Sequence, residues 1–164
     1  MKKILLSVSL ALSSIAMAGN MSIPMSLLAN NQTIGTIDLA DSPYGLVLTP
    51  HLHGLLPGLH GFHLHENPTC ANFGAASGDH FDPMNTKQHL GPYNPQGELG
   101  DLPILIVNID GTATIAILAP RLTVAKVINH SLVIKKLGDN YSDHPAKGGG
   151  GGENLACGVV KAIS

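Results

Sequence analysis

The sequence predicts an all-β domain, a sandwich or barrel of seven or eight short strands joined by turns and two long loops. Three observations predict it. Runs of β-prone residues recur at short intervals, Gly and Pro interrupt every candidate segment longer than ten residues, and no stretch has a convincing helical period. With 164 residues, 44% of them hydrophobic, the chain is long enough for one domain with its own core.

The first segment is expected to be a signal peptide rather than part of the fold. Lys2 and Lys3 give it a basic start, residues 4–15 form an apolar stretch, and Ala16-Met17-Ala18 supplies small residues for cleavage before Gly19. An uncleaved membrane anchor is the alternative, but the apolar run is shorter than the ~20 residues that span a bilayer. We therefore expect residues 19–164 to form the mature domain, periplasmic or secreted and not bound to a membrane.

The predicted strands follow in order. Residues 21–28, 33–39 and 44–49 are the first three, and Asn30-Asn31 and Asp41-Ser42-Pro43 supply the turns between them. Residues 104–109 and 112–118 flank Asp110-Gly111, the strongest short-range hairpin signal in the sequence. Residues 131–135 and 159–163 complete the set.

Two segments lack a strand pattern, residues 66–103 and 138–154. Loops of this length inside a small domain are uncommon and tend to carry function. The chain also carries nine histidines, an excess for a domain with 12% charged residues. Seven basic residues remain beyond Lys3 against eleven acidic ones, a net charge of about −4 that argues against nucleic acid as a partner.

Cys70 and Cys157 are the only cysteines. In an oxidising compartment they are expected to form a disulfide, which would stabilise the fold by roughly 4 kcal/mol in the chain-entropy model. A thiolate metal site is the alternative, but such sites normally need closely spaced cysteines.

The histidines point to a metal site. His63 and His65 are two residues apart, so on a strand both imidazoles project from one face. His80, His89 and Asp101 follow in the first long loop and add nitrogen and oxygen donors of the kind that Zn(II) and Cu(II) bind. Spacing alone names neither the metal nor the reaction.

Several motifs in the same order resemble the copper/zinc superoxide dismutases, in their bacterial secreted branch. The resemblance covers essentially the whole mature chain and implies a Greek-key β-sandwich, or flattened barrel, of about eight antiparallel strands. The matching segments are 58–66 (GLHGFHLHE), 78–83 (GDHFDP), 89–93 (HLGPY), 100–103 (GDLP), 118–122 (LAPRL), 138–143 (GDNYSD) and 156–160 (ACGVV).

The resemblance implies a copper ion, a zinc ion and superoxide as substrate. It assigns Asp139 to the carboxylate that orients histidines of both metals, matches Cys70 and Cys157 to the family disulfide, and makes His60 structural. The ligands it implies are His63, His65 and His80 for copper, with His80 bridging, and His80, His89 and Asp101 for zinc.

Three positions depart from the family pattern. Lys135 stands where a fourth copper histidine is expected, Glu98 where a third zinc histidine is expected, and Asn154 where an arginine guides the anion. A protonated lysine cannot bind copper, and a neutral lysine binds it only if its pKa is strongly depressed. Glu98, in contrast, can complete a tetrahedral zinc site with His80, His89 and Asp101. Loss of the arginine slows capture of superoxide without abolishing redox chemistry.

The sequence therefore predicts a family member whose dismutase activity is weak or lost, with zinc retained more readily than copper. Three functional alternatives stay open: a fully active enzyme with an altered site, with Lys135 as the guiding cation; a module that stores or buffers metal; and a scaffold for protein contacts. A different strand register would instead make Lys135-Lys136 a simple exposed pair. The sequence leaves a monomer and a homodimer both open. The pair His51 and His53 is read as exposed polar residues rather than an auxiliary metal site, and His130 and His144 as structural or solvated.

Overall fold

The computed structural model describes residues 21–162. The segment expected to be a signal peptide, residues 1–18, lies outside them. In the described part of the chain no helix is long and apolar enough to cross a bilayer. The elements there are β1 (Met21–Leu27), β2 (Thr33–Ser42), β3 (Gly45–Leu52), β4 (Gly58–His60), β5 (Phe62–His65), η1 (Ala75–Ser77), β6 (Leu105–Val107), β7 (Ile117–Ala119), α1 (Val124–Val127), β8 (His130–Lys135), η2 (Lys147–Gly150) and β9 (Asn154–Val160).

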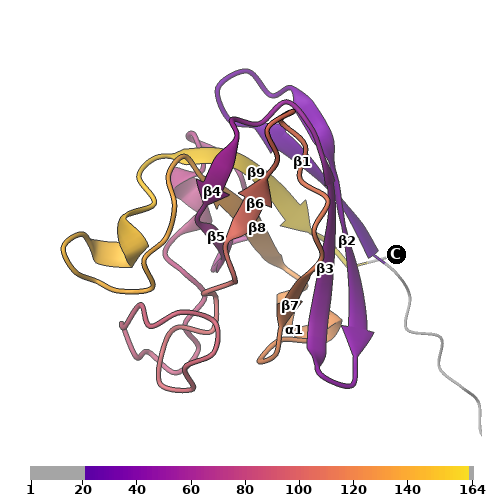
Figure 1. The fold of residues 1–164 in the computed structure, drawn as a ribbon. Coiled ribbons are helices and arrows are strands. Elements are labelled where there is room, and N and C mark those ends of the chain that lie inside the picture. Colours follow the sequence, from indigo (N-terminus) through magenta and orange to yellow (C-terminus); the bar gives the residue numbers. More distant parts are fainter. Residues whose placement is uncertain (1–20, 163–164) are drawn as a thin grey trace, which may run out of the picture.

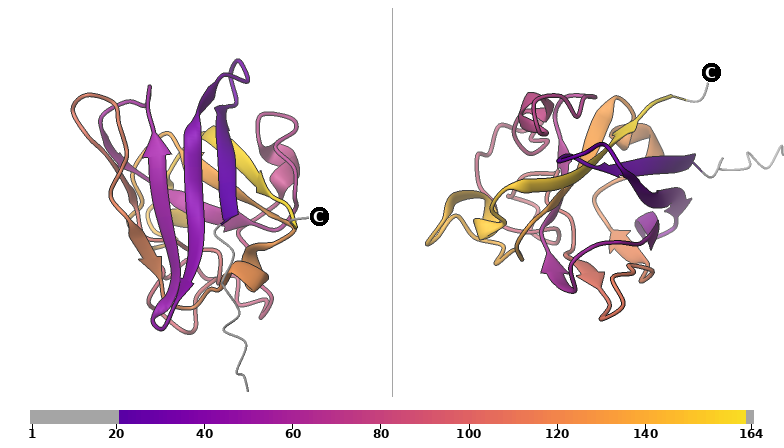
Figure 2. Two further views of the ribbon diagram at one scale, coloured as in Figure 1. Left: turned by 90° about the vertical axis from the view of Figure 1, so that its right-hand side faces the viewer. Right: turned by 90° about the horizontal axis from the view of Figure 1, so that it is seen from above.

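All strand pairs are antiparallel. Seven strands form one sheet in the order β5-β8-β9-β1-β2-β3-β7, and β4 pairs with β6 in a second, two-stranded sheet (Figure 1). The strands curl round a common interior (Figure 2). The prediction of an all-β domain is confirmed.

Alternation of apolar and polar residues builds the first strands. In β1, Met21, Ile23 and Met25 are buried while Ser22 and Pro24 between them are exposed, as expected for a strand with one face on the core. Other buried side chains of the same core are Ile34, Ile37, Leu39, Leu46, Leu48, Phe62, Leu64, Leu105, Leu132 and Ile134.

The predicted hairpin about Asp110-Gly111 is wrong. A tight turn does form, because Asn108 N donates to Thr112 O at 2.8 Å, but β6 pairs with β4 and β7 pairs with β3. Immediately after the turn, Ala113 and Leu52 exchange backbone hydrogen bonds of 3.0 and 3.1 Å. This pairing draws the chain to the other sheet. Of the predicted strand 112–118, only residues 117 and 118 lie in a strand, β7.

The last strand begins earlier than predicted, at Asn154, and ends at Val160. Its small residues Ala156, Cys157 and Gly158 have weak β-propensity, but β8 on one side and β1 on the other pair with them. Gly158 is required there, because a Cβ at this position would lie 2.6 Å from Pro24 O.

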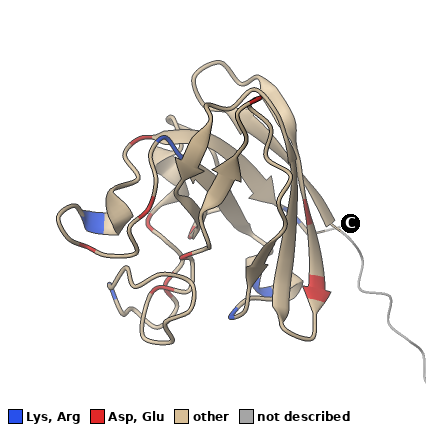
Figure 3. Ribbon diagram, in the orientation of Figure 1, with Lys and Arg blue, Asp and Glu red and all other residues tan. Residues whose placement is uncertain are grey.

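The two predicted loops are present and lie on the same side of the molecule, away from β2 and β3 (Figure 1). The first joins β5 to β6 and the second joins β8 to β9, each interrupted only by a short 3-10 helix. The predicted disulfide is confirmed: Cys70 in the first loop is bonded to Cys157 in β9. Many of the charged residues lie in these loops (Figure 3).

Candidate metal centre

His63 and His65 lie on β5, at one end of the seven-stranded sheet, and both rings are buried. The register pairs His63 with Val133 and His65 with Ser131 of β8. Residues directly opposite in an antiparallel pair share a face of the sheet, so both imidazoles project from one face, as the spacing predicts.

Neighbouring groups fix which nitrogen of each ring faces the interior. His63 Nε2 lies 2.7 Å from the Asp139 carboxylate, so it carries the proton and Nδ1 keeps its lone pair. His65 Nδ1 lies 2.7 Å from Gly78 O and therefore donates, which leaves Nε2 with the lone pair. These two nitrogens, His63 Nδ1 and His65 Nε2, are buried and have no hydrogen-bond partner within residues 21–162.

Four donor groups meet in the first loop. His80 Nδ1 lies 3.0 Å from Glu98 Oε2 and 3.2 Å from Asp101 Oδ1. His89 Nδ1 lies 2.8 Å from Asp101 Oδ1 and 3.8 Å from Glu98 Oε2. A tetrahedral zinc ion with bonds of about 2.0 Å has donors about 3.3 Å apart, so this set is close to the spacing that zinc requires.

The loop is held against β5 by backbone contacts. Single β-bridges join His63 to Asp101 and His65 to His80. Gly100 N donates to Phe81 O at 2.7 Å, and a Cβ at Gly100 would overlap Leu64 O, so only glycine allows this approach. The bridges place donors of the loop beside the strand histidines.

Backbone amides orient one donor carboxylate. Asp101 Oδ2 accepts hydrogen bonds from Leu90 N at 3.1 Å and Gly91 N at 2.9 Å. Its other oxygen, Oδ1, therefore points to His80 and His89. Such support fixes a ligand before the ion arrives.

Asp139 in the second loop connects the two groups of histidines. Besides His63, its carboxylate accepts from His89 Nε2 at 2.8 Å and from Tyr141 N at 2.7 Å. Gly149 packs directly on this carboxylate, where a Cβ would overlap Asp139 Oδ1. Asp139 thus fixes the rings of His63 and His89 through their Nε2 atoms and leaves their Nδ1 atoms facing inward.

The histidines of the site differ in pKa. Burial, together with the charge of His80, lowers the pKa of His63 to about 3 and that of His65 to about 2. Burial also opposes charge on His89, but its hydrogen bonds to Asp101 and Asp139 outweigh this and raise its pKa to about 11. The strand histidines are neutral donors, whereas His89 carries a proton that a metal must displace.

Lys135 and Asn154, the two other substituted positions, lie next to each other. They are paired across β8 and β9, and Lys135 Nζ donates to Asn154 Oδ1 at 2.7 Å. Lys135 N donates to Gly61 O at 2.8 Å, which continues the β5–β8 register and puts Lys135 on the face of His63 and His65. Both side chains are half-buried, so the reading of Lys135-Lys136 as an exposed pair does not hold for Lys135.

Ligand atoms of His63, His80 and His89 lie within 4.8 Å of one another, as do those of His80, His89, Glu98 and Asp101. The expected copper set of His63, His65 and His80 does not form such a group among the described residues. The four-donor set fits zinc. Cu(II) prefers four planar donors, and a protonated Lys135, in the position where the family resemblance leads us to expect a fourth imidazole, does not fit that ion.

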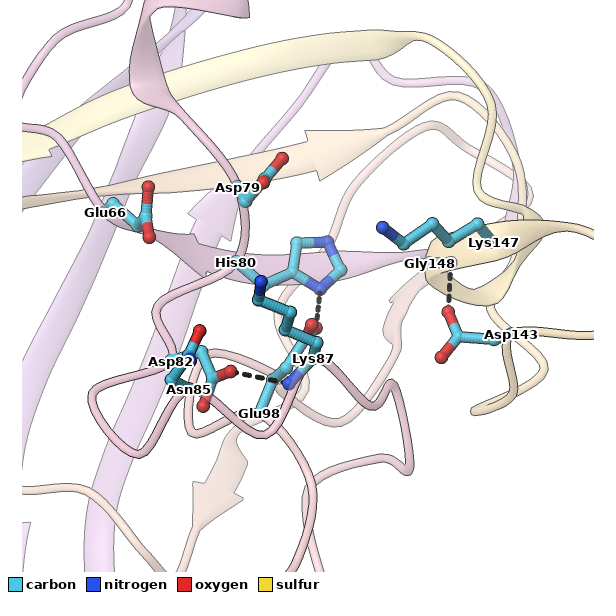
Figure 4. A pocket seen from close by; sticks show the side chains of 10 residues that line it. All are labelled: Glu66, Asp79, His80, Asp82, Asn85, Lys87, Glu98, Asp143, Lys147 and Gly148. Atoms are coloured by element: carbon cyan, nitrogen blue, oxygen red, sulfur yellow. Dashed lines mark hydrogen bonds and ion pairs between the residues drawn. The ribbon is translucent and has the colours of Figure 1, made fainter.

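A cavity of about 390 Å³ lies outside His80 and Glu98. His80 and Lys147 both reach toward it, from the first and the second loop (Figure 4). It is an opening from solvent toward the four-donor set. The lining residues are Glu66, Asp79, His80, Asp82, Asn85, Lys87, Glu98, Asp143, Lys147 and Gly148.

The remaining histidines lie apart from these groups. His60 has carbonyls of Leu56 and Lys135 at 2.8 Å from its two ring nitrogens. The ring of the exposed His51 lies 3.2 Å from the exposed Asp38 carboxylate. The others are His53 and His144, both exposed, and His130, whose ring lies 2.8 Å from Glu66 O and 4.1 Å from the Phe81 ring.

Sequence reasoning gave no role to Arg121. Its guanidinium donates to Pro92 O at 3.0 Å, to Gly97 O at 2.9 Å and to Glu98 O, and so fixes the segment that carries Glu98. The motif 118–122 contains this arginine, but its partners are backbone carbonyls, which leave no signal in the sequence.

The chain is similar to known proteins over most of its length. The family model for copper/zinc superoxide dismutase (SODC) matches residues 33–160. The superoxide dismutase [Cu-Zn] of Actinobacillus pleuropneumoniae is 52% identical over 140 residues, covering 80% of this chain and 74% of that protein.

Solved structures match the fold. Cu/Zn superoxide dismutase from Brucella abortus has a TM-score of 0.82 at 39% identity, over 87% of this chain and 100% of that chain. A SOD-like protein from Bacillus subtilis has a TM-score of 0.71 at 26% identity, over 87% of this chain and 99% of that chain.

Proposed function

Since the chain belongs to the copper/zinc superoxide dismutase family, we propose that it is a secreted, zinc-binding member with weak or lost dismutase activity. The family reaction is the copper-dependent disproportionation of superoxide to O₂ and H₂O₂. Copper, when bound, supplies the one-electron redox chemistry of that reaction. The residues that would hold copper here are His63, His65 and His80.

The observation that carries this proposal is the position of Lys135. It lies on the face of β8 that meets His63 and His65, and its Nζ is hydrogen-bonded to Asn154. The ammonium cannot act as a ligand, so a copper ion there would have three imidazoles rather than four. The protein also lacks the arginine that guides superoxide to copper in the family, because Asn154 occupies that position.

The spacing of the four donors supports retention of zinc. His80, His89, Glu98 and Asp101 each offer one atom within 4.8 Å of the others, and Glu98 takes the role of the missing histidine. Asp139 holds His89 from behind, and backbone amides hold Asp101. This same observation favours a second candidate function, a module that binds or buffers zinc without turnover.

We also propose that the protein works in the periplasm or outside the cell. The disulfide between Cys70 and Cys157 is typical of an oxidising compartment. The basic and apolar residues 1–18 are the expected signal peptide. Detection of a mature chain beginning at Gly19 in a periplasmic fraction would support this assignment, and a chain still carrying residues 1–18 in the cytoplasm would contradict it.

Metal analysis of the mature protein, combined with a superoxide assay, separates the functional classes. After equilibration with zinc and copper, we expect about one zinc per chain, little copper and little turnover. Stoichiometric copper with turnover at the rate of ordinary family members would overturn the proposal. Neither metal nor turnover would favour a scaffold instead.

A further inference from the structure

Lys135 and Asn154 are joined by a hydrogen bond between their side chains. This pair affects which metal the protein binds, in addition to removing a copper ligand. We propose that Asn154 positions the Lys135 ammonium so that its charge excludes Cu(II) from His63 and His65, leaving zinc as the metal that the protein holds. The inference rests on the proposed zinc-binding function. It makes Lys135 a determinant of metal selectivity and Asn154 its positioning residue.

The backbone places the two side chains together. Lys135 and Asn154 are opposite each other in the β8–β9 register, where a register shift follows Ile134. Cross-strand neighbours of this kind project from one face and contact each other. Lys135, at the expected copper-histidine position, and Asn154, at the expected arginine position, are therefore in direct contact with each other rather than in two separate sites.

The lysine stem is confined as well as its ammonium. A Cβ at Gly61 would lie 3.2 Å from Lys135 Cγ, and a Cβ at Gly151 would lie 2.9 Å from the same atom, so the stem passes between two glycine backbones. The hydrogen bond of 2.7 Å to Asn154 Oδ1 then fixes the end of the chain. A free lysine side chain samples many rotamers, whereas this one is held at both points.

The ammonium lies within electrostatic reach of the inward-facing nitrogens. The lone pairs of His63 Nδ1 and His65 Nε2 are buried and unpartnered, the arrangement expected of metal donors. The charge of Lys135 adds to burial and to the charge of His80 in lowering the pKa of both rings. Burial lowers the pKa of Lys135 itself, and the charges of Asp139 and Asp79 oppose this by favouring the ammonium. Lys135 thus supplies the positive charge that faces Asp139 and the two histidines.

A fixed positive charge penalises a divalent ion strongly. The repulsion is proportional to the product of the charges and is larger in a half-buried site than in water. Zinc in the four-donor set is affected less, because Glu98 and Asp101 bring two negative charges of their own. The Lys135 ammonium therefore weakens metal binding more at His63 and His65 than in the four-donor set.

The test is the Cu(II) affinity of zinc-loaded protein, measured by competition with a chelator of known affinity. Lys135→Leu removes the charge and adds no ligand atom, and we expect the affinity to rise at least about tenfold. Asn154→Leu should raise it by a smaller factor, because the untethered ammonium moves toward solvent. The double variant should bind copper no more tightly than Lys135→Leu alone.

Lys136→Leu is the matched control, since Lys136 is exposed and pairs with Glu153 at 3.3 Å. It removes the same charge from the neighbouring position and should leave copper affinity unchanged. Zinc affinity and melting temperature report whether each variant is folded, and Asn154→Ala replaces Asn154→Leu if the larger side chain disturbs packing.

Unchanged copper affinity in Lys135→Leu, or an equal gain in Lys136→Leu, would overturn the inference. Unchanged affinity in both Asn154 variants would overturn the role of Asn154. If Lys135→His gains copper but Lys135→Leu does not, a missing ligand is the whole explanation. In that case the proposed function stands and this inference fails.

Discussion

The Glu98 carboxylate lies 3.0 Å from His80 Nδ1, in the position where family resemblance leads us to expect a third zinc imidazole. The carboxylate adds a negative charge to a group that already contains Asp101. Arg121 holds the backbone of Glu98, so the position of this donor is fixed from both ends. We therefore expect Glu98 to act as a zinc donor in the four-donor set.

Glu98→Gln should weaken zinc binding by at least about tenfold, because the amide oxygen is a poorer ligand and carries no charge. Zinc competition with a chromogenic chelator measures this directly. Glu66→Gln is the control, since Glu66 lines the same cavity outside the donor set. Equal zinc affinity of Glu98→Gln and the unmodified protein would show that Glu98 is not a ligand.

Asp139→Asn should lower zinc affinity roughly 10–100-fold, although Asp139 is not among the four donors. An amide cannot accept hydrogen bonds from His63, His89 and Tyr141 as the carboxylate does. His89 therefore loses its fixed orientation. Isothermal titration of the metal-free variant with zinc gives the measurement, and an affinity unchanged within threefold would contradict the role of Asp139.

Gly149→Ala should disturb the same carboxylate by steric overlap. The added Cβ would overlap Asp139 Oδ1 and lie 2.7 Å from His89 Nε2. Gly150→Ala is a matched control, because both glycines have positive φ, 78° and 72°, but at Gly150 the nearest atom is 3.8 Å away. Each should cost about 1 kcal/mol of stability from backbone strain, and only Gly149→Ala should also lose zinc affinity.

The metal-free protein should be most stable near pH 6.5. The raised pKa of His89, about 11, gives stability that is complete below its unfolded value of 6.5 and is lost as pH rises toward 11. The lowered pKa of His63, about 3, gives stability that is present above 6.5 and lost as pH falls toward 3. Melting temperatures at pH 4.5, 6.5 and 9 test both limbs.

With zinc bound, the melting temperature should depend less on pH between 6.5 and 9, because the ion displaces the proton that His89 holds in the metal-free protein. Zinc affinity should accordingly rise with pH between 6.5 and 9. A metal-free melting temperature that is constant or increasing over this range would contradict the charge assigned to His89.

Much of the fold could be predicted from local pattern. The alternation in 21–28 and the turn residues after 39 predict β1 to β3 because those strands are neighbours in both sequence and space. The hairpin about Asp110-Gly111 failed because long-range pairing of Ala113 with Leu52 wins over the local turn signal. The start of β9 failed because its small residues depend on neighbouring strands for their conformation.

The site was predictable as a set of residue types but not as an arrangement. Spacing indicates that His63 and His65 share a face, and family resemblance brings the loop donors to them. Nothing in the sequence indicates that Lys135 and Asn154 bond to each other, since they are 19 positions apart and the bond depends on the β8–β9 register. The contacts of Arg121 with backbone carbonyls are hidden for the same reason.

We propose above all that Lys135 and Asn154 suppress dismutation. The most direct test compares the rate of superoxide disappearance for the mature protein and for the double variant Lys135→His/Asn154→Arg, each equilibrated with zinc and copper. We expect the unmodified protein to be at least about 100-fold slower, since it lacks a ligand and the guiding charge. Equal rates at the level of ordinary family members would contradict the account.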